Sequence, residues 1–116
     1  YYSVFLAENL NLKAAMINPA VWAYKIFEND RGDVENLNTD EKYFIDQAWI
    51  DSLEDIFIEN PTPDRYLVLL QTGDETLDYK YAEKYFSGAR IVIDEGGSHS
   101  FDGLEQKIPQ ILLHFS

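Results

Sequence analysis

The sequence has 116 residues, 46% of them hydrophobic and 15% aromatic, which is enough for one modest domain with a core. Twenty-one acidic and nine basic residues give a formal net charge of -12, which argues against binding nucleic acid or an anionic membrane surface. The absence of cysteine excludes disulfides, a CxxC redox site and a thiolate metal site. No apolar run approaches the ~20 residues of a membrane span, and we expect a cytoplasmic protein.

The chain begins with a predicted helix and a predicted strand. Apolar side chains of residues 1–10 lie on roughly one helical face, and an apolar run at 13–17 ends at Asn18-Pro19. Proline has no N–H and biases the residue before it away from helix, so we predict a strand over 13–18. Because no N-cap or turn precedes the helix, we expect residues 1–116 to be the C-terminal part of a longer protein.

Residues 20–65 are predicted to form a lid or cap inserted in this single domain. The stretch 20–30 suggests a short helix, and the acidic stretch 28–42 suggests a solvated loop without the spacing of a calcium-binding EF-hand. A second helix is predicted from Thr39 or Asp40 to Asn60. Such a long connection between strands often covers a site, and we expect its aromatic residues, together with Phe101, to line a substrate pocket: Trp22, Tyr24 and Trp49.

Two further apolar runs, near 66–72 and 89–94, predict strands that are buried on both faces. The segment between them has helical spacing, with Asp78 as its N-cap and Ser87-Gly88 as its end. A strand–helix–strand unit is right-handed and makes its two strands parallel. The fold class is therefore α/β, with three parallel strands and flanking helices.

An acid and a histidine follow these two strands. Asp74 comes just after the strand near 66–72, and His99 lies in a glycine-rich loop just after the strand near 89–94. The carboxyl ends of parallel strands lie on one edge of the sheet, where ligands bind in open α/β folds. We therefore expect the two side chains to meet, as the acid and the base of a hydrolase do.

The sequence lacks a matching nucleophile. A Ser-Asp-His hydrolase of this kind places its serine before the acid in a G-x-S-x-G turn, and no such motif is present. Ser3 and Ser52 lack the flanking glycines, and Ser98 and Ser100 come too late in the chain. Paired carboxylates for glycoside hydrolysis, Asp74 with Glu75 or Asp94 with Glu95, are poor candidates because sequence neighbours point apart.

The end of the chain, 101–115, predicts an amphipathic helix that Pro109 kinks or restarts. Its inward face would carry Phe101, Leu104, Ile108, Ile111 or Leu112, and Phe115. His114 near the helix C-terminus is assigned a structural role, since a cation there interacts well with the helix dipole. No glycine-rich phosphate loop is present, and we expect no cofactor and no metal.

Two motif runs resemble the C-terminal part of the YqiA-type esterases, small bacterial members of the α/β-hydrolase superfamily. The runs are LLQTGDETLDYKYAEKYF and IVIDEGGSHSFDGLE, with Met16-Ile17-Asn18-Pro19-Ala20 upstream. The resemblance implies that Asp74 and His99 are the acid and histidine of a Ser-His-Asp triad. It places the serine in a Gly-x-Ser-x-Gly-Gly turn directly before Tyr1, within the missing N-terminal half of the protein.

The resemblance implies a serine esterase that hydrolyses small acyl esters or thioesters, and an inactive 116-residue piece. The alternative left open by the missing serine is a non-catalytic α/β-hydrolase-like module that binds a partner or ligand.

Overall fold

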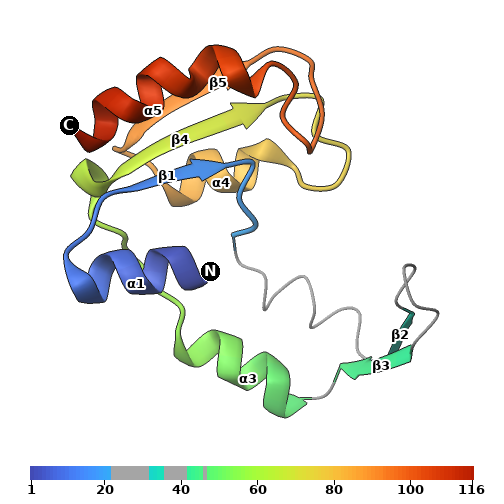
Figure 1. Ribbon diagram of the computed structural model, residues 1–116. Coiled ribbons are helices and arrows are strands. Elements are labelled where there is room, and N and C mark those ends of the chain that lie inside the picture. The colour runs from blue at the N-terminus through green and yellow to red at the C-terminus, as the bar shows by residue number, and fades with distance from the viewer. Residues whose placement is uncertain (22–31, 36–41, 46) are drawn as a thin grey trace. The chain divides into compact units, whose positions relative to one another are not determined.

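The computed structural model describes residues 1–21, 32–35, 42–45 and 47–116 (Figure 1). They form two compact units: one comprises Tyr2–Val21 with Ile58–Ser116, and the other comprises Tyr1 with Trp22–Phe57. The larger unit contains α1 (Tyr2–Leu10), β1 (Ala14–Ile17), η1 (Pro63–Arg65), β4 (Tyr66–Gln71), α4 (Tyr79–Tyr85), β5 (Arg90–Asp94), η2 (Leu104–Lys107) and α5 (Ile108–Phe115).

The larger unit is built on a parallel sheet in the order β1-β4-β5, as the sequence predicts. Leu69 in the central strand pairs with Ile17 on one side and with Val92 on the other. All six residues of β4 are buried, which agrees with a strand covered on both faces. The observed strands match the predicted ranges to within one or two residues at their ends.

Helices cover both faces of this sheet, α5 on one side and α4 on the other (Figure 1). On the α5 side, Leu67 and Leu69 form a buried cluster with Phe101. On the α4 side, the ring of Tyr66 packs against Phe86 with 5.2 Å between the ring centroids. Alternate residues of β4 thus point into two separate cores, which holds the strand in a single register.

The predicted N-cap of α4 is confirmed, and the helix ends at Tyr85, shortly before the predicted end at Ser87-Gly88. The carboxylate of Asp78 accepts a hydrogen bond from the backbone N–H of Lys80 at 3.0 Å, as an N-cap does. Gly88, just beyond the helix, has a φ of 94°, which glycine adopts without steric cost. These two residues mark where α4 begins and where the chain turns towards β5.

Helix α1 is joined to the start of β4 through Glu8. Its carboxylate accepts hydrogen bonds from the backbone N–H and hydroxyl of Thr62 and from the hydroxyl of Tyr66, and it pairs with Arg65 at 3.4 Å. Burial raises the pKa of Glu8, but these partners outweigh burial and leave the pKa below its usual value. The same contact and burial raise the pKa of Tyr66.

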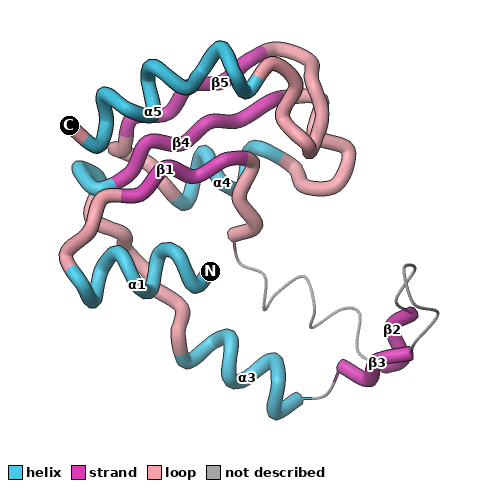
Figure 2. Tube along the Cα trace, viewed as in Figure 1, coloured by secondary structure: helices cyan, strands magenta, loops and turns pink. Residues whose placement is uncertain are grey.

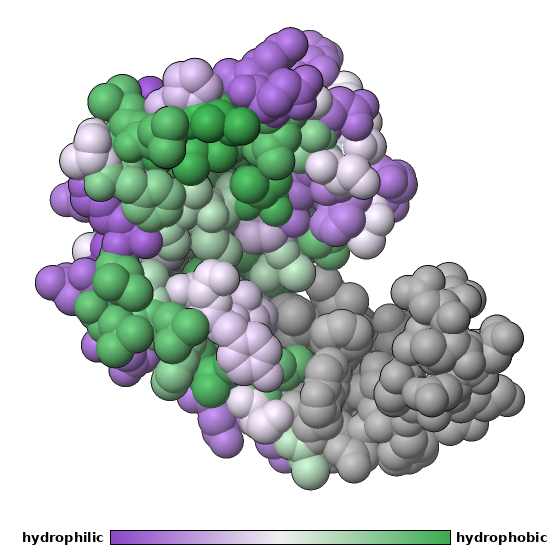
Figure 3. Space-filling view, viewed as in Figure 1, coloured by the Kyte–Doolittle hydropathy of each residue, from purple (hydrophilic) through white to green (hydrophobic). Residues whose placement is uncertain are grey.

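The last helix differs from the prediction. The chain forms the short 3₁₀ helix η2 and then α5, which starts with Pro109 in its first turn, so the proline restarts the helix. Leu104 and Ile111 pack on the core, but Ile108, Leu112 and Phe115 are 47%, 66% and 51% exposed. Figure 3 shows the resulting apolar surface over α5. The predicted inward face was therefore only partly correct.

The smaller unit contains β2 (Gly32–Glu35), β3 (Lys42–Ile45) and α3 (Gln47–Asp55). β2 and β3 pair antiparallel, with Asp33 opposite Phe44. The prediction of helix from Thr39 or Asp40 was therefore wrong at 42–45, and the predicted loop 28–42 includes a strand. The helix predicted at 20–30 lies outside the described residues from position 22 onward.

Candidate active site

The carboxyl ends of the three parallel strands lie on one edge of the sheet. The loops that follow β4 and β5 leave this edge side by side (Figures 1 and 2). Backbone hydrogen bonds join them, because Gly73 N–H donates to the carbonyl of Gly96 at 2.7 Å and Thr72 N–H donates to the carbonyl of Asp94 at 3.0 Å. The loops that follow β4 and β5 are therefore hydrogen-bonded to each other and form one surface.

Asp74 and His99 meet on this surface, as the parallel-strand argument predicts. Oδ2 of Asp74 lies 2.9 Å from Nδ1 of His99. The Asp74 side chain is only 2% exposed, whereas that of His99 is 40% exposed. The pair thus has a buried carboxylate at one end and a ring that reaches solvent at the other.

The second carboxylate oxygen of Asp74 is also occupied. Oδ1 accepts hydrogen bonds from the backbone N–H groups of Thr76 and Leu77, both at 2.9 Å. Burial raises the pKa of Asp74, but the hydrogen bonds from His99, Leu77 and Thr76 together outweigh burial, and the pKa lies below its usual value. An ionised Asp74 can only accept hydrogen bonds, so Nδ1 of His99 carries the proton, and in the neutral ring the lone pair of Nε2 is free.

The backbone of His99 is fixed on both sides. Its N–H donates to Oε2 of Glu75 at 3.0 Å, and its carbonyl accepts from Nδ2 of Asn18 at 3.0 Å. Of the polar groups of His99, Nε2 has no hydrogen-bond partner among the residues that the structure describes. That nitrogen is the one able to exchange a proton with a bound molecule.

Asn18, just after β1, is a site residue that sequence reasoning missed. It is 5% exposed, and its Nδ2 also donates to the carbonyl of Ser98 at 2.9 Å, while its Oδ1 accepts from Gln71 N–H at 3.1 Å. Its φ of 41° places it in the left-handed region, which asparagine tolerates better than most residues. The sequence offered one signal, an asparagine between a buried strand and a proline.

Close backbone packing explains why position 73 is a glycine. A Cβ at Gly73 would lie 2.4 Å from the carbonyl oxygen of Gly97 and 2.8 Å from backbone atoms of Gly96. A side chain at Gly73 would therefore push the β4 and β5 loops apart. The hydroxyl of Thr72 accepts from Gly96 N–H at 2.8 Å and adds to the same contact.

Of the four residues predicted to line a substrate pocket, only Phe101 has a side chain among the described residues. Trp22 and Tyr24 lie outside the described residues, as does the side chain of Trp49 in α3. The side chain of Phe101 is 4% exposed and packs against Leu67 and Leu69, so it is part of the hydrophobic core. Its φ of 67° also shows that it does not begin the last helix.

The alternative nucleophiles and carboxylate pairs have other partners or positions. The hydroxyl of Ser98 donates to Oδ1 of Asp102 at 2.7 Å. Asp94 pairs with Lys107 at 2.8 Å, and that hydrogen bond and charge lower its pKa. Ser3 and Ser52 lie on exposed faces of α1 and α3.

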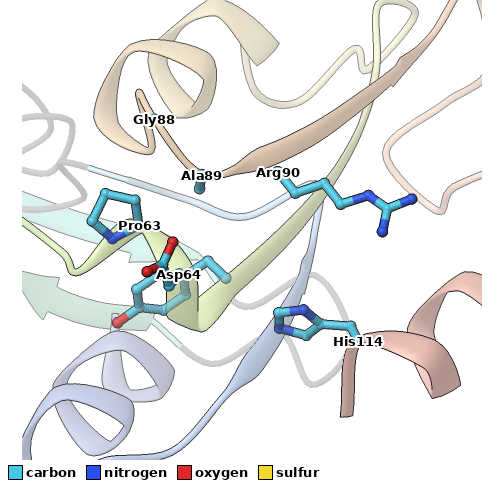
Figure 4. Close-up of a pocket in the computed structure, with 7 residues that line it drawn as sticks. Pro63, Asp64, Gly88, Ala89, Arg90 and His114 are labelled. Carbon is cyan, nitrogen blue, oxygen red and sulfur yellow. The ribbon is translucent and has the colours of Figure 1, made fainter. Parts of the chain in front are cut away.

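Two cavities lie at opposite ends of the strands. One, of about 420 Å³, adjoins Asp74 and is lined by Thr72 and by residues 74–80. The other, of about 410 Å³, lies where β4 and β5 begin and is lined by Pro63, Asp64, Tyr66, Gly88, Ala89, Arg90 and His114 (Figure 4). There, Nε2 of His114 lies 2.9 Å from the carbonyl oxygen of Arg65, a contact that agrees with a structural role for that histidine.

Within the described parts of the chain, no group of three or more histidine, aspartate or glutamate side chains is arranged to hold a metal ion. None of the helices within 1–21 and 47–116 combines the length and apolarity that a membrane span requires.

Comparison with protein families agrees with the fold and the motif runs. The family model described as "Uncharacterised protein family (UPF0227)" matches residues 1–116. The chain belongs to this family. It is the family of YqiA-type esterases in the α/β-hydrolase superfamily, which is the one that the two motif runs resemble. The parallel sheet β1-β4-β5 with its flanking helices agrees with the C-terminal part of an α/β-hydrolase fold.

Proposed function

We propose that this chain carries the acid and the base of a Ser-His-Asp triad in a serine esterase. The observation that carries the proposal is the paired geometry: Oδ2 of the buried Asp74 lies 2.9 Å from Nδ1 of His99, and Nε2 of that partly exposed ring has no hydrogen-bond partner among the described residues. The proposed nucleophile is a serine upstream of Tyr1. The proposed substrates are small acyl esters or thioesters.

The chemistry follows from this pair. Nε2 of His99 takes the proton from the serine hydroxyl as its oxygen attacks the acyl carbonyl, and returns it to the leaving alcohol or thiol. Asp74 keeps the ring in the Nδ1–H tautomer and stabilises the imidazolium that forms. A water molecule then attacks the acyl-enzyme in the same way: Nε2 takes a proton from the water and returns it to the serine oxygen, and the carboxylic acid is released. In this scheme the segment 20–65 is proposed to serve as a lid over the acyl group.

The test uses the full-length protein and p-nitrophenyl butyrate as a chromogenic ester. His99→Ala is expected to lower kcat/KM by on the order of 10⁴-fold or more, as removal of a triad base does. His114→Gln is the matched control, because it changes the other histidine within residues 1–116, and its activity should stay within a few-fold of the unmodified protein. Near-normal hydrolysis by His99→Ala would remove the proposal.

A fluorophosphonate probe gives a second, independent readout. It should label one serine upstream of Tyr1, found by mass spectrometry, and labelling should be lost in His99→Ala because the serine is no longer activated. Labelling confined to serines within residues 1–116 would contradict the assignment.

A non-catalytic binding module is the second candidate, favoured by the absence of a G-x-S-x-G turn from the 116 residues. The intact mass of the native protein from its source separates the two. A mass that corresponds to residues 1–116 alone favours the binding module, and a larger mass with an upstream serine turn favours the esterase.

A further inference from the structure

Gln71, the last residue of β4, has a side chain whose hydrogen-bonding capacity is fully used. It is 3% exposed. Its Oε1 accepts from the backbone N–H groups of Ser98 and Asp102 at 3.1 and 2.9 Å. Its Nε2 donates to the carbonyl of Asp102 at 2.7 Å and to Oδ2 of Asp94 at 3.4 Å. An amide has two donor hydrogens and two acceptor lone pairs, and all four are satisfied here.

The loop after β5 is shaped around this amide. Gly97 has a φ of 77°, and a Cβ at that position would lie 1.9 Å from Oε1 of Gln71. Three of the four hydrogen bonds go to backbone groups at the two ends of segment 98–102, and His99 lies inside this segment. Gln71 therefore closes the short loop that carries the histidine.

We infer that Gln71 is the positioning residue that sets the place of the His99 ring relative to Asp74, an inference that rests on the proposed esterase function. Gln71 is buried, and none of the four hydrogen bonds of its side chain goes to the ring of His99. Its effect on the reaction must therefore pass through the backbone of segment 98–102.

Other contacts would keep this loop folded without Gln71. Phe101 stays buried in the core, and Asn18 still binds the carbonyls of Ser98 and His99. Loss of the amide is thus expected to loosen the position of the ring rather than unfold the unit. A displacement of about 1 Å at a catalytic group can cost on the order of 10²-fold in rate. Because Gln71 is only 3% exposed, we expect no contact with the substrate and little change in KM.

The experiment compares two substitutions at Gln71 with the same two at Gln106 in the full-length protein. Gln71→Met keeps the length of the side chain and removes its hydrogen bonds. Gln71→Glu keeps the acceptors for two N–H groups but places an oxygen against the carbonyl of Asp102 and the carboxylate of Asp94. Gln106 is exposed on η2, so its variants report the same chemical changes without the contact.

The expected result with p-nitrophenyl butyrate is a loss of kcat of about 10- to 100-fold in both Gln71 variants, with KM within twofold and a retained cooperative melt. The Nδ1–H proton resonance of His99 should shift or broaden in those variants. Both Gln106 variants should match the unmodified protein in kcat and in this resonance. A purely structural role would lower the melting temperature and leave kcat of the folded protein unchanged.

A kcat for folded Gln71→Met within twofold of Gln106→Met would overturn the inference. Should Gln71→Met fail to fold, Gln71→Glu against Gln106→Glu decides by the same criterion. Full activity in the Gln71 variants together with an inactive His99→Ala removes only the positioning role. An active His99→Ala removes the esterase proposal and this inference with it.

Discussion

Substitution of Asn18 tests how strongly the histidine loop is fixed to β1. Its side chain makes three hydrogen bonds, two as donor to the carbonyls of Ser98 and His99 and one as acceptor from Gln71 N–H. A hydrogen bond contributes about 1 kcal/mol net to stability, so their loss costs about 3 kcal/mol. The φ of 41° adds about 1 kcal/mol when alanine replaces asparagine.

We therefore expect Asn18→Ala to lower the free energy of unfolding by about 4 kcal/mol, a large share of the 5–15 kcal/mol typical of a domain. Asn18→Gly removes the side chain but accommodates the backbone, and should cost about 3 kcal/mol. Asn11 is the matched control, because it has a φ of 57° and an exposed side chain. Asn11→Ala should cost only the backbone part, about 1 kcal/mol.

Equilibrium unfolding of the full-length protein in urea measures these differences as shifts in the midpoint at constant slope. Asn18→Ala should also slow hydrolysis of p-nitrophenyl butyrate, since the carbonyl of His99 loses a donor. If Asn18→Ala and Asn11→Ala destabilise equally, the three hydrogen bonds contribute nothing and the reasoning is refuted.

Three further substitutions address the acid, the glycine contact and the α4 cap. The pKa of Asp74 is lowered in the folded state, so its contribution to stability is present above about pH 4 and is lost on further acidification. The stability difference between the unmodified protein and Asp74→Asn should therefore shrink below about pH 4 in urea titrations; a difference that stays constant would contradict this. Gly73→Ala should lower the free energy of unfolding by about 3 kcal/mol, because its Cβ would lie 2.4 Å from the Gly97 carbonyl oxygen. Gly96→Ala should lower it by only about 1 kcal/mol, because its Cβ meets open space. Equal shifts in the urea midpoint would count against the contact at Gly73. Asp78→Ala should cost about 1 kcal/mol and Asp78→Asn almost nothing, since asparagine also caps helices; equal losses would show that the cap is not the cause.

The sequence was sufficient for the sheet and for the Asp74–His99 pair. Both follow from local signals: apolar runs of strand length, turn residues at their ends and the handedness of the crossover. The strand at 42–45 was missed because Phe44 and Ile45 fit a helical spacing with later residues, while the pairing of β3 with β2 is a tertiary contact. In the last helix, Pro109 was correctly singled out, but periodicity could not show which apolar side chains stay exposed.

The amides that support the pair had no comparable signal. Asn18 bonds to residues 80 and 81 positions away, and Gln71 bonds to residues 23 to 31 positions away. Asparagine and glutamine are common in turns and at strand ends, so neither residue type predicts such partners. The close approach of Gly97 to Gln71 depends on the folded path of both loops, which spacing in the sequence does not give.

Burial explains why Asp74, and not its neighbour Glu75, acts on the histidine ring. Both carboxylates bind His99. Oδ2 of Asp74 lies against Nδ1 of the ring, and the Asp74 side chain is 2% exposed. Glu75 is exposed and binds the backbone N–H of His99. Water and salt screen an exposed charge, so Glu75 adds little to the stability of an imidazolium. A buried carboxylate acts through a lower effective dielectric and is already satisfied by two backbone N–H groups. The two adjacent acids therefore have different effects: Asp74 holds the proton on Nδ1 of the ring, and Glu75 holds the backbone of His99 in place.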